Sequence, residues 1–236
     1  MNDLSIIFYT SNSISDYFMA NVQEQLLRAV GDTPIISVSF KPTVVGNNCT
    51  NIVWGDQKPS VYNIYKMILL GAEEAKTEYC AMAEDDVLYS KEHFEYRPSK
   101  KDVFAYDMNK WSIFTWSKPQ RFSYRENRRT MTSLVVSREA LIKTLEERYA
   151  KYPVLEDIDP NIYKYYWGEP SRFERHVGIT EVKSEKYFAS VPHIIFSHDK
   201  ALGFSQLGHR KAHGSVIKYE LEPWGTAESI AKLYSK

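Results

Sequence analysis

Short apolar runs alternate with amphipathic segments through the first third of the chain. The runs at 4–9, 35–40 and 79–83 have the length and composition of buried strands. Between them, apolar residues recur every three or four positions at 15–30 and 60–76, which predicts two helices with one apolar face each. Strands that alternate with helices are typical of a parallel sheet covered by helices. We therefore expect the α/β fold class.

The remaining segments are less regular. Turn-forming residues predict a loop from 41 to about 59. Further strands are predicted at 102–106, 111–116, 132–136 and 191–197. Ser137 is expected to cap a helix that continues to Tyr149, and residues 171–177 to form a short helix. No linker or change of composition divides the chain, so we expect a single domain over residues 1–236.

Three consecutive carboxylates, Glu84, Asp85 and Asp86, follow the apolar run at 79–83. Like charges at a strand end repel one another, so a fold that places them there needs a cation beside them. In an extended segment Glu84 and Asp86 would point to one side and Asp85 to the other. Ligands of parallel α/β sheets bind at the carboxyl ends of strands. The pattern suits a divalent cation that also binds phosphate oxygens; the alternative is a solvated acidic turn.

Composition narrows the class of protein further. Hydrophobic residues make up 43% of the chain and charged residues 25%, as in globular proteins. The formal net charge is zero, so the protein as a whole has no long-range electrostatic attraction to nucleic acid. Two cysteines do not form a disulfide framework or a zinc cluster, which is compatible with a reducing cytosol. No apolar run approaches the ~18 residues that span a bilayer, and no signal peptide is recognisable. We expect a cytoplasmic protein without membrane insertion.

Four pieces of the chain occur in a familiar order. They are the opening strand and polar turn with Tyr9, Thr10 and Ser11, the segment 62–80, the acidic triplet 84–86 and the segment 132–141. In this order they resemble the glycosyltransferases of the GT-A fold, in the style of the large family-two group. The first piece is similar to that family's nucleotide-contacting segment, and the triplet stands at its D-x-D motif. The last resembles the strand and helix behind its acceptor site.

The resemblance implies a GT-A fold and a metal-dependent transfer of a hexosyl or pentosyl group. The donor would be a nucleotide-diphosphate sugar, and the acceptor a hydroxyl group of a glycan, a protein or a modified DNA base. Residues 1–90 would form the nucleotide-binding half and 91–236 the acceptor half, with a C-terminal loop that closes over the donor. Asp86 would bind the metal, and His198, which follows a predicted strand, would be a second ligand. Histidine beside carboxylate favours Mn²⁺, with Mg²⁺ as the alternative; the other interpretation of His198 is a structural histidine.

The chain departs from the family pattern at two places. Glu84 stands at the first acidic position of the motif instead of Asp, so Asp86 is the expected ligand, and Glu84 and Asp85 are expected to reach ribose or sugar hydroxyls. Glu169 is the candidate catalytic base, although Pro170 occupies the position where inverting members often carry Asp. Glu174 also lies nearby, but its spacing from Ser171 fits a helix capping box.

Two basic segments are candidates for phosphate binding. The first runs from His198 to residue 211, is punctuated by glycine, and is expected to place Lys200, Arg210 and Lys211 on the donor diphosphate. The second is a cluster of Arg121, Arg125, Arg128 and Arg129. For this cluster we expect a solvated face; the alternative is an acceptor surface for phosphate-bearing material, including nucleic acid.

Two other functions compete with glycosyl transfer. A non-catalytic sugar- or nucleotide-binding module on the same fold would explain the altered positions Glu84 and Pro170. A nucleotidyltransferase ranks lower, because such enzymes carry a glycine-rich basic loop after the first strand, and residues 9–15 contain neither glycine nor basic residues.

Overall fold

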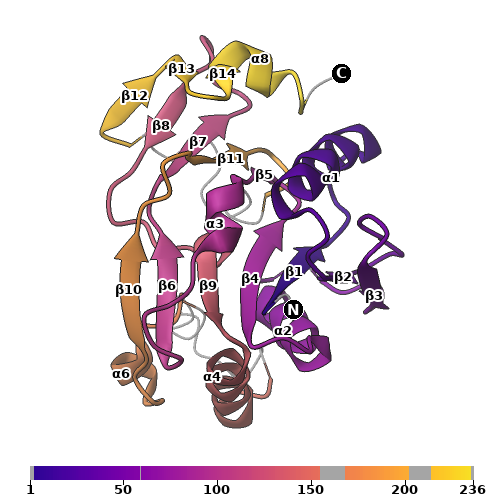
Figure 1. The fold of residues 1–236 in the computed structure, drawn as a ribbon, viewed down its shortest axis with the longest axis vertical. Coiled ribbons are helices and arrows are strands. Elements are labelled where there is room, and N and C mark those ends of the chain that lie inside the picture. Colours follow the sequence, from indigo (N-terminus) through magenta and orange to yellow (C-terminus); the bar gives the residue numbers. More distant parts are fainter. Residues whose placement is uncertain (1–2, 59, 155–167, 202–213, 235–236) are drawn as a thin grey trace.

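A seven-stranded sheet forms the centre of the protein in a computed structural model that describes residues 3–58, 60–154, 168–201 and 214–234. Its strand order is β10-β6-β9-β4-β1-β2-β3 (Figure 1). The strands are β1 (Leu4–Thr10), β2 (Ile35–Ser39), β3 (Cys49–Val53), β4 (Tyr79–Glu84), β6 (Val103–Asp107), β9 (Leu134–Ser137) and β10 (Lys183–Tyr187). All run parallel except β9, which is antiparallel to both β4 and β6.

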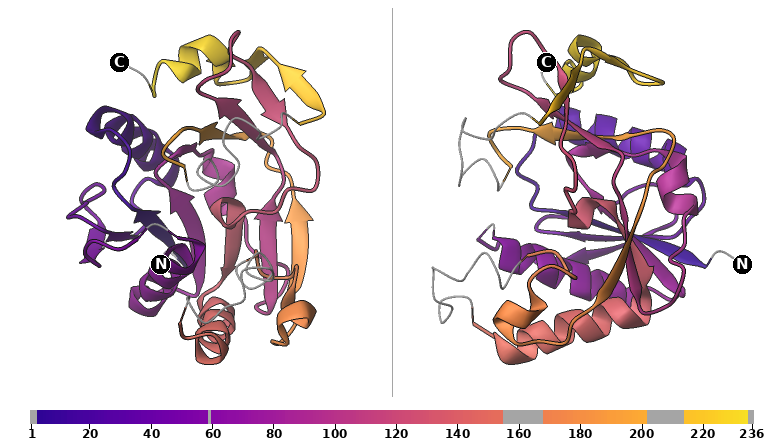
Figure 2. Two further views of the ribbon diagram at one scale, coloured as in Figure 1. Left: turned by 180° about the vertical axis from the view of Figure 1, so that it is seen from behind. Right: turned by 90° about the vertical axis from the view of Figure 1, so that its left-hand side faces the viewer.

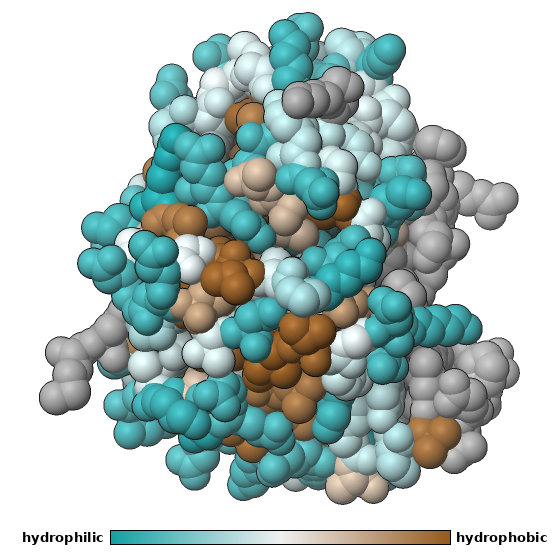
Figure 3. All heavy atoms as spheres, turned by 90° about the vertical axis from the view of Figure 1, so that its right-hand side faces the viewer, coloured by the Kyte–Doolittle hydropathy of each residue, from teal (hydrophilic) through white to brown (hydrophobic). Residues whose placement is uncertain are grey.

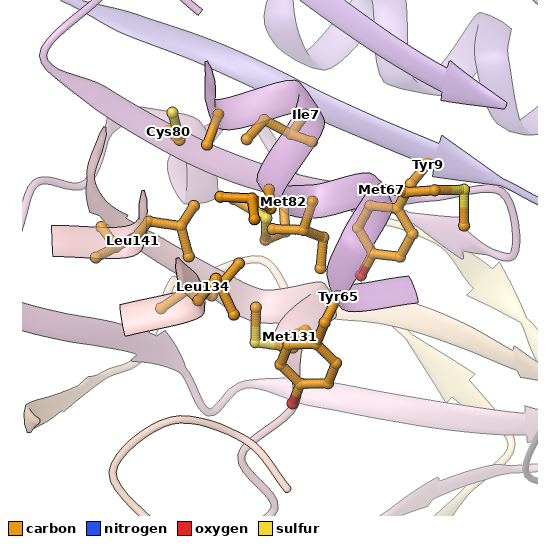
Figure 4. Packing of buried hydrophobic residues seen from close by; sticks show 14 of the residues in the cluster. Ile7, Tyr9, Tyr65, Met67, Cys80, Met82, Met131, Leu134 and Leu141 are labelled. Carbon is orange, nitrogen blue, oxygen red and sulfur yellow. The ribbon is translucent and has the colours of Figure 1, made fainter. Parts of the chain in front are cut away.

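Helices cover both faces of this sheet (Figure 2). On one face lie α2 (Val61–Glu74) and α4 (Arg138–Lys151), and on the other lie α1 (Asp16–Val30) and α3 (Lys91–Glu95). Side chains alternate along each strand, so each strand contributes residues to the apolar cores on both faces of the sheet. In β1, Ile7 packs in the core beneath α2 and α4, whereas Ile6 packs in the core beneath α1. Figure 4 shows part of the first cluster, where Ile7, Met82 and Leu134 converge.

Serine residues begin the three long helices. Ser15, Ser60 and Ser137 each accept a hydrogen bond from a backbone amide in the first turn of α1, α2 and α4. These caps explain why each helix starts where it does after a strand or loop. The predicted cap at Ser137 is therefore confirmed.

A second sheet packs above the carboxyl ends of the first. Its order is β12-β8-β7-β11-β5, from β12 (Val216–Lys218), β8 (Phe122–Tyr124), β7 (Lys110–Phe114), β11 (His193–Ser197) and β5 (Val87–Leu88). A hairpin of β13 (Glu220–Leu221) and β14 (Gly225–Thr226) and the helix α8 (Ala227–Ala231) follow. Phe18 of α1 lies in the same apolar cluster as Phe196 of β11 and Ala227 of α8, so α1 joins the two sheets.

The predicted fold class is confirmed: one α/β domain with a largely parallel sheet flanked by helices. The loop predicted at 41–59 is wrong in part, because β3 extends the edge of the sheet there by pairing with β2. The strands β5, β8, β10, β12, β13 and β14 and the helices α3 and α8, each two to five residues long, were not predicted. The short helix predicted at 171–177 is α6 (Glu174–Val177), and a single 3-10 turn, η1 (Met131–Ser133), precedes β9.

The surface mixes hydrophilic and apolar side chains. On the face shown in Figure 3, apolar patches lie among hydrophilic groups. The described residues contain no helix with the length and apolar character needed to cross a membrane.

Candidate functional site

A cavity of about 350 Å³ opens where β1 and β4 end. The predicted site residues that line it are Tyr9, Thr10, Ser11, Glu84, Asp85, Asp86, Glu169, His198 and Lys200. They come from segments up to about 190 positions apart in the chain, yet the fold brings them to one place. Arg210 and Lys211 lie outside the described residues, as does most of the loop expected to close over the donor.

All three carboxylates line the cavity. β4 ends at Glu84, and Asp85 and Asp86 form a turn before β5, so these two lie outside the extended segment for which the alternation was expected. The Tyr9 hydroxyl donates a hydrogen bond to Glu84 Oε1, and Thr10 Oγ1 donates one to Asp85 Oδ2. The first two carboxylates are thus held by side chains from the end of β1.

Burial makes this acidic turn costly when it is fully charged. Burial, and next the negative charge of Asp86, raise the pKa of Glu84 well above its usual value and that of Asp85 to about 7. The hydrogen bonds from Tyr9 and Thr10 oppose these shifts. A cation placed beside Asp86 would relieve the repulsion, which is the electrostatic condition for metal binding here.

Arg128 supplies a protein cation at this site, and the expectation of a solvated face was wrong for it. Its guanidinium lines the cavity and donates a hydrogen bond to Ser112 Oγ at 2.7 Å, whereas Arg125 is exposed. Burial lowers the pKa of Arg128, while Glu169, Asp86 and Glu84 act to raise it. The arginine cluster was recognised in the sequence, but nothing in its spacing distinguishes the half-buried Arg128 from the exposed Arg125.

Asp86 and His198 lie next to each other in the cavity. His198 Nε2 lies 3.4 Å from Asp86 Oδ2. Asp86 Oδ1 and His198 Nε2 are both buried without a hydrogen-bond partner among the described residues. Each of these two atoms is therefore available to a bound ligand. His198 Nδ1 accepts the Lys200 amide at 3.2 Å, which places the proton of a neutral ring on Nε2. Coordination through Nε2 therefore requires the Lys200 amide to move away, and Asp86 is the ligand that needs no rearrangement.

Glu169 also faces the cavity, whereas Glu174 does not line it. The Glu169 carboxylate lies 3.2 Å from Arg172 Nη1 and is about a quarter exposed. Glu174 is buried, accepts a hydrogen bond from the Ser171 amide and lies 3.6 Å from Arg148 Nη2. Glu174 thus accepts the Ser171 amide as a capping box would have it, but α6 begins at Glu174 with Phe173 as its N-cap, so the predicted helix capping box is wrong. Glu169, unlike Glu174, lines the cavity.

The amino terminus of α2 forms another wall of the cavity and was not predicted as part of the site. Ser60, Asn63, Ile64 and Tyr65 line it there, and the first turn contains no acidic residue. The positive end of a helix dipole stabilises anions such as phosphate. On the far side, Thr130 and Thr132 beside η1 add hydroxyl groups. These residues carry no short sequence motif, because they reach the cavity only through the packing of α2 and η1.

Several solved glycosyltransferases are similar to this structure over 78% of the chain. GlyE of Streptococcus pneumoniae TIGR4 gives a TM-score of 0.45 at 9% identity over 44% of that chain, and its apo form gives 0.43 at 8% identity over 45%. A glycosyltransferase involved in the glycosylation of the major capsid of PBCV-1 gives 0.42 at 11% identity over 81% of its length. The chain thus spans less than half the length of GlyE. No protein-family model matches the sequence, and no curated protein matches it.

Proposed function

We propose that this protein is a metal-dependent glycosyltransferase that moves a sugar from a nucleotide-diphosphate donor to a hydroxyl acceptor. The observation that carries the proposal is the meeting of Asp86, His198, Arg128 and the amino terminus of α2 around one cavity at the carboxyl ends of β1 and β4. A cation-binding carboxylate next to a guanidinium and a helix amino terminus suits a diphosphate, which carries negative charge on both phosphates.

The parts of the donor are assigned by chemistry. A Mn²⁺ ion, or Mg²⁺ in its place, would be held by Asp86 and His198 and would neutralise the leaving diphosphate. Arg128 and Lys200 line the same wall and would bind phosphate oxygens. Tyr9, Thr10 and Ser11 at the end of β1 would contact the nucleotide, and Glu84 and Asp85 the ribose or sugar hydroxyls.

Glu169 would remove the proton from the acceptor hydroxyl as that oxygen attacks the anomeric carbon. Its carboxylate is turned into the cavity but remains partly open to solvent, so an acceptor can reach it. Arg128 sits close enough to Glu169 for the two charges to interact, because Glu169 acts to raise the pKa of Arg128. The transferred group would be a hexose or pentose, and the acceptor a glycan, a protein or a modified DNA base.

A non-catalytic binding module is the second candidate. It is favoured by one observation: Glu84 and Asp85 are both engaged by Tyr9 and Thr10 and so are less free to bind a substrate. Such a module would hold nucleotide sugars without turnover and without dependence on metal. The cytoplasmic location expected from the sequence stays a prediction.

Thermal shift and calorimetry with UDP-, GDP- and dTDP-sugars, each with and without Mn²⁺, test this proposal. We expect stabilisation by one nucleotide class that depends on metal, followed by slow release of free sugar. Binding without metal dependence and without sugar release would favour the binding module. No binding of any nucleotide would refute both candidates.

A further inference from the structure

A second group of potential metal ligands lies outside the cavity. His93 of α3, Asp107 at the end of β6 and His193 at the start of β11 have ligand atoms that all lie within 4.8 Å of one another. Their exposed fractions are 0%, 0% and 1%. None of the three lines the proposed donor cavity. They connect three elements, one from the main sheet, one from the second sheet and one helix.

The nitrogen and oxygen atoms of this group are close together, and several of them have no hydrogen-bond partner among the described residues. His193 Nε2 is 3.0 Å from Asp107 Oδ2, yet neither atom makes a hydrogen bond of acceptable direction to any residue that the structure describes. His93 Nε2 and His193 Nδ1 are also buried without a partner in the described part of the chain. Two ligands that are each about 2.1 Å from one zinc ion lie roughly 3.0–3.4 Å apart, with their lone pairs directed at the ion instead of at each other. A hydrogen-bonded histidine–aspartate pair would have a similar distance, but its N–H would point at the carboxylate oxygen.

Contacts behind the ligands hold them in this orientation. The Asn109 and Ala189 amides donate to Asp107 Oδ1 at 2.9 and 3.3 Å, which turns Oδ2 toward the imidazole rings. His93 Nδ1 lies 2.8 Å from the Tyr187 hydroxyl, so Nδ1 carries the contact to the protein and Nε2 faces the group. Metal-bound histidines commonly use their second ring nitrogen in this way.

The charges of the site are compatible with a buried cation. Burial, and next the neighbouring His193, lower the pKa of His93 well below its usual value, although Asp107 and the Met82 carbonyl act in the other direction. Burial would raise the pKa of Asp107, but the contacts with His193, His93 and the Asn109 amide together outweigh this and lower it. Lys110 Nζ donates to the Asp107 carbonyl, and burial lowers the pKa of this lysine to about 7.

We propose that His93, Asp107 and His193 bind a structural zinc ion that fastens the second sheet to the first. Two imidazoles and one carboxylate supply three of the four ligands of a tetrahedral zinc ion, and water would be the fourth, whereas Mg²⁺ and Ca²⁺ prefer oxygen ligands alone. Tyr89 connects this site to the acidic turn: its ring lies 5.5 Å from that of His93 and 5.1 Å from that of His193, and its hydroxyl accepts the Glu84 amide at 3.0 Å. The zinc site would therefore support the turn from behind, and it does not depend on the function proposed for the cavity.

The test uses the full chain with Asp86 replaced by Asn, which removes the main ligand of the cavity and so isolates the second site. Elemental analysis of this protein after chelation and addition of zinc is expected to find one zinc ion per chain, with a higher melting temperature than the chelated protein. Cobalt in place of zinc should give the intense visible bands of a four- or five-coordinate site that contains imidazole. Absence of retained zinc, or only the weak spectrum of hexa-aqua-like cobalt, would overturn the proposal.

Variants within the group provide the second line of evidence. His93→Gln and Asp107→Asn preserve size and are expected to abolish zinc retention, and Tyr187→Phe should weaken zinc binding about ten- to a hundredfold because it removes an orienting contact. Undiminished zinc affinity in the folded His93→Gln protein would contradict the assignment. If the ligand variants do not fold, the metal content and cobalt spectrum of the Asp86→Asn protein still decide the question, and Tyr187→Phe supplies the comparison.

Discussion

The Tyr9 hydroxyl donates a hydrogen bond to the Glu84 carboxylate, and the two residues are also paired in register between β1 and β4. The bond joins the ends of two neighbouring parallel strands at the edge where the cavity opens. It lowers the pKa of Glu84 against the stronger upward effects of burial and of Asp86. The departure of Glu84 from the expected Asp thus has a structural counterpart, because its longer side chain reaches the Tyr9 hydroxyl.

Replacement of Tyr9 by Phe should destabilise the protein. The change leaves the buried Glu84 oxygen without its donor, and we expect a loss of about 1–2 kcal/mol in the free energy of unfolding. Urea denaturation at neutral pH measures this, with the exposed Tyr219→Phe as the matched control. Equal stability of the two variants would mean that the Tyr9–Glu84 bond contributes nothing.

Replacement of Arg128 by Gln should weaken binding of a nucleotide diphosphate. The guanidinium lines the cavity and would make charged hydrogen bonds to the donor, so we expect Kd to rise about ten- to a hundredfold. The exposed Arg125→Gln belongs to the same sequence cluster and serves as the control, with little change expected. Calorimetry with UDP and GDP in the presence of Mn²⁺ gives both values. A similar loss in the two variants would point to a general charge effect and not to a contact in the cavity.

Replacement of Glu169 by Gln should separate chemistry from binding. Loss of a general base lowers kcat by about a hundred- to ten-thousandfold, while the affinity for the donor changes little. Its surface partner provides the control: Arg172→Gln removes the pair with Glu169 but leaves the carboxylate in place. Rates of sugar transfer and donor Kd should be measured for both. Retention of wild-type kcat by Glu169→Gln would assign the base to another group.

Replacement of Gly71 by Ala should destabilise the packing of α2 on the sheet. A methyl group at this position would meet the Ile7 Cγ2 atom at 2.6 Å in a fully buried contact. The helix preference of Ala contributes about 1 kcal/mol, but overpacking costs about 1–3 kcal/mol, so we expect a net loss. The same change in an Ile7→Ala background should be less harmful, because the clashing atom is gone. Additive effects of the two substitutions in chemical denaturation would contradict this explanation.

The central sheet could be predicted because its strands are long and apolar. β1, β2 and β4 bury almost every side chain, and α2 shows a clear apolar face, so periodicity alone located them. β3 was missed because its residues are only partly buried, which removes the pattern on which such a prediction depends. In the second sheet β7 and β11 were predicted, but the sheet itself was not, because its other strands are two or three residues long and its pairings join distant segments, such as β5 with β11.

Site residues that belong to a sequence motif were predicted. Site residues that reach the cavity only through tertiary packing were missed. The acidic triplet, Glu169 and His198 stand next to predicted strand ends or departures from a known pattern, and all reach the cavity. Arg128 and the amino terminus of α2 reach it through tertiary structure. The alternation expected at Asp85 assumed an extended segment, but β4 ends at Glu84 and a turn follows.

Binding of nucleotide-diphosphate sugars to the wild-type protein and to Asp86→Asn, with and without Mn²⁺, tests the central claim most directly. For the wild type we expect calorimetric binding of one nucleotide class that is strengthened by the metal, together with release or transfer of the sugar. Asp86→Asn should lose the effect of the metal and nearly all turnover, although its fold is retained. Full metal-dependent turnover by Asp86→Asn would contradict the account.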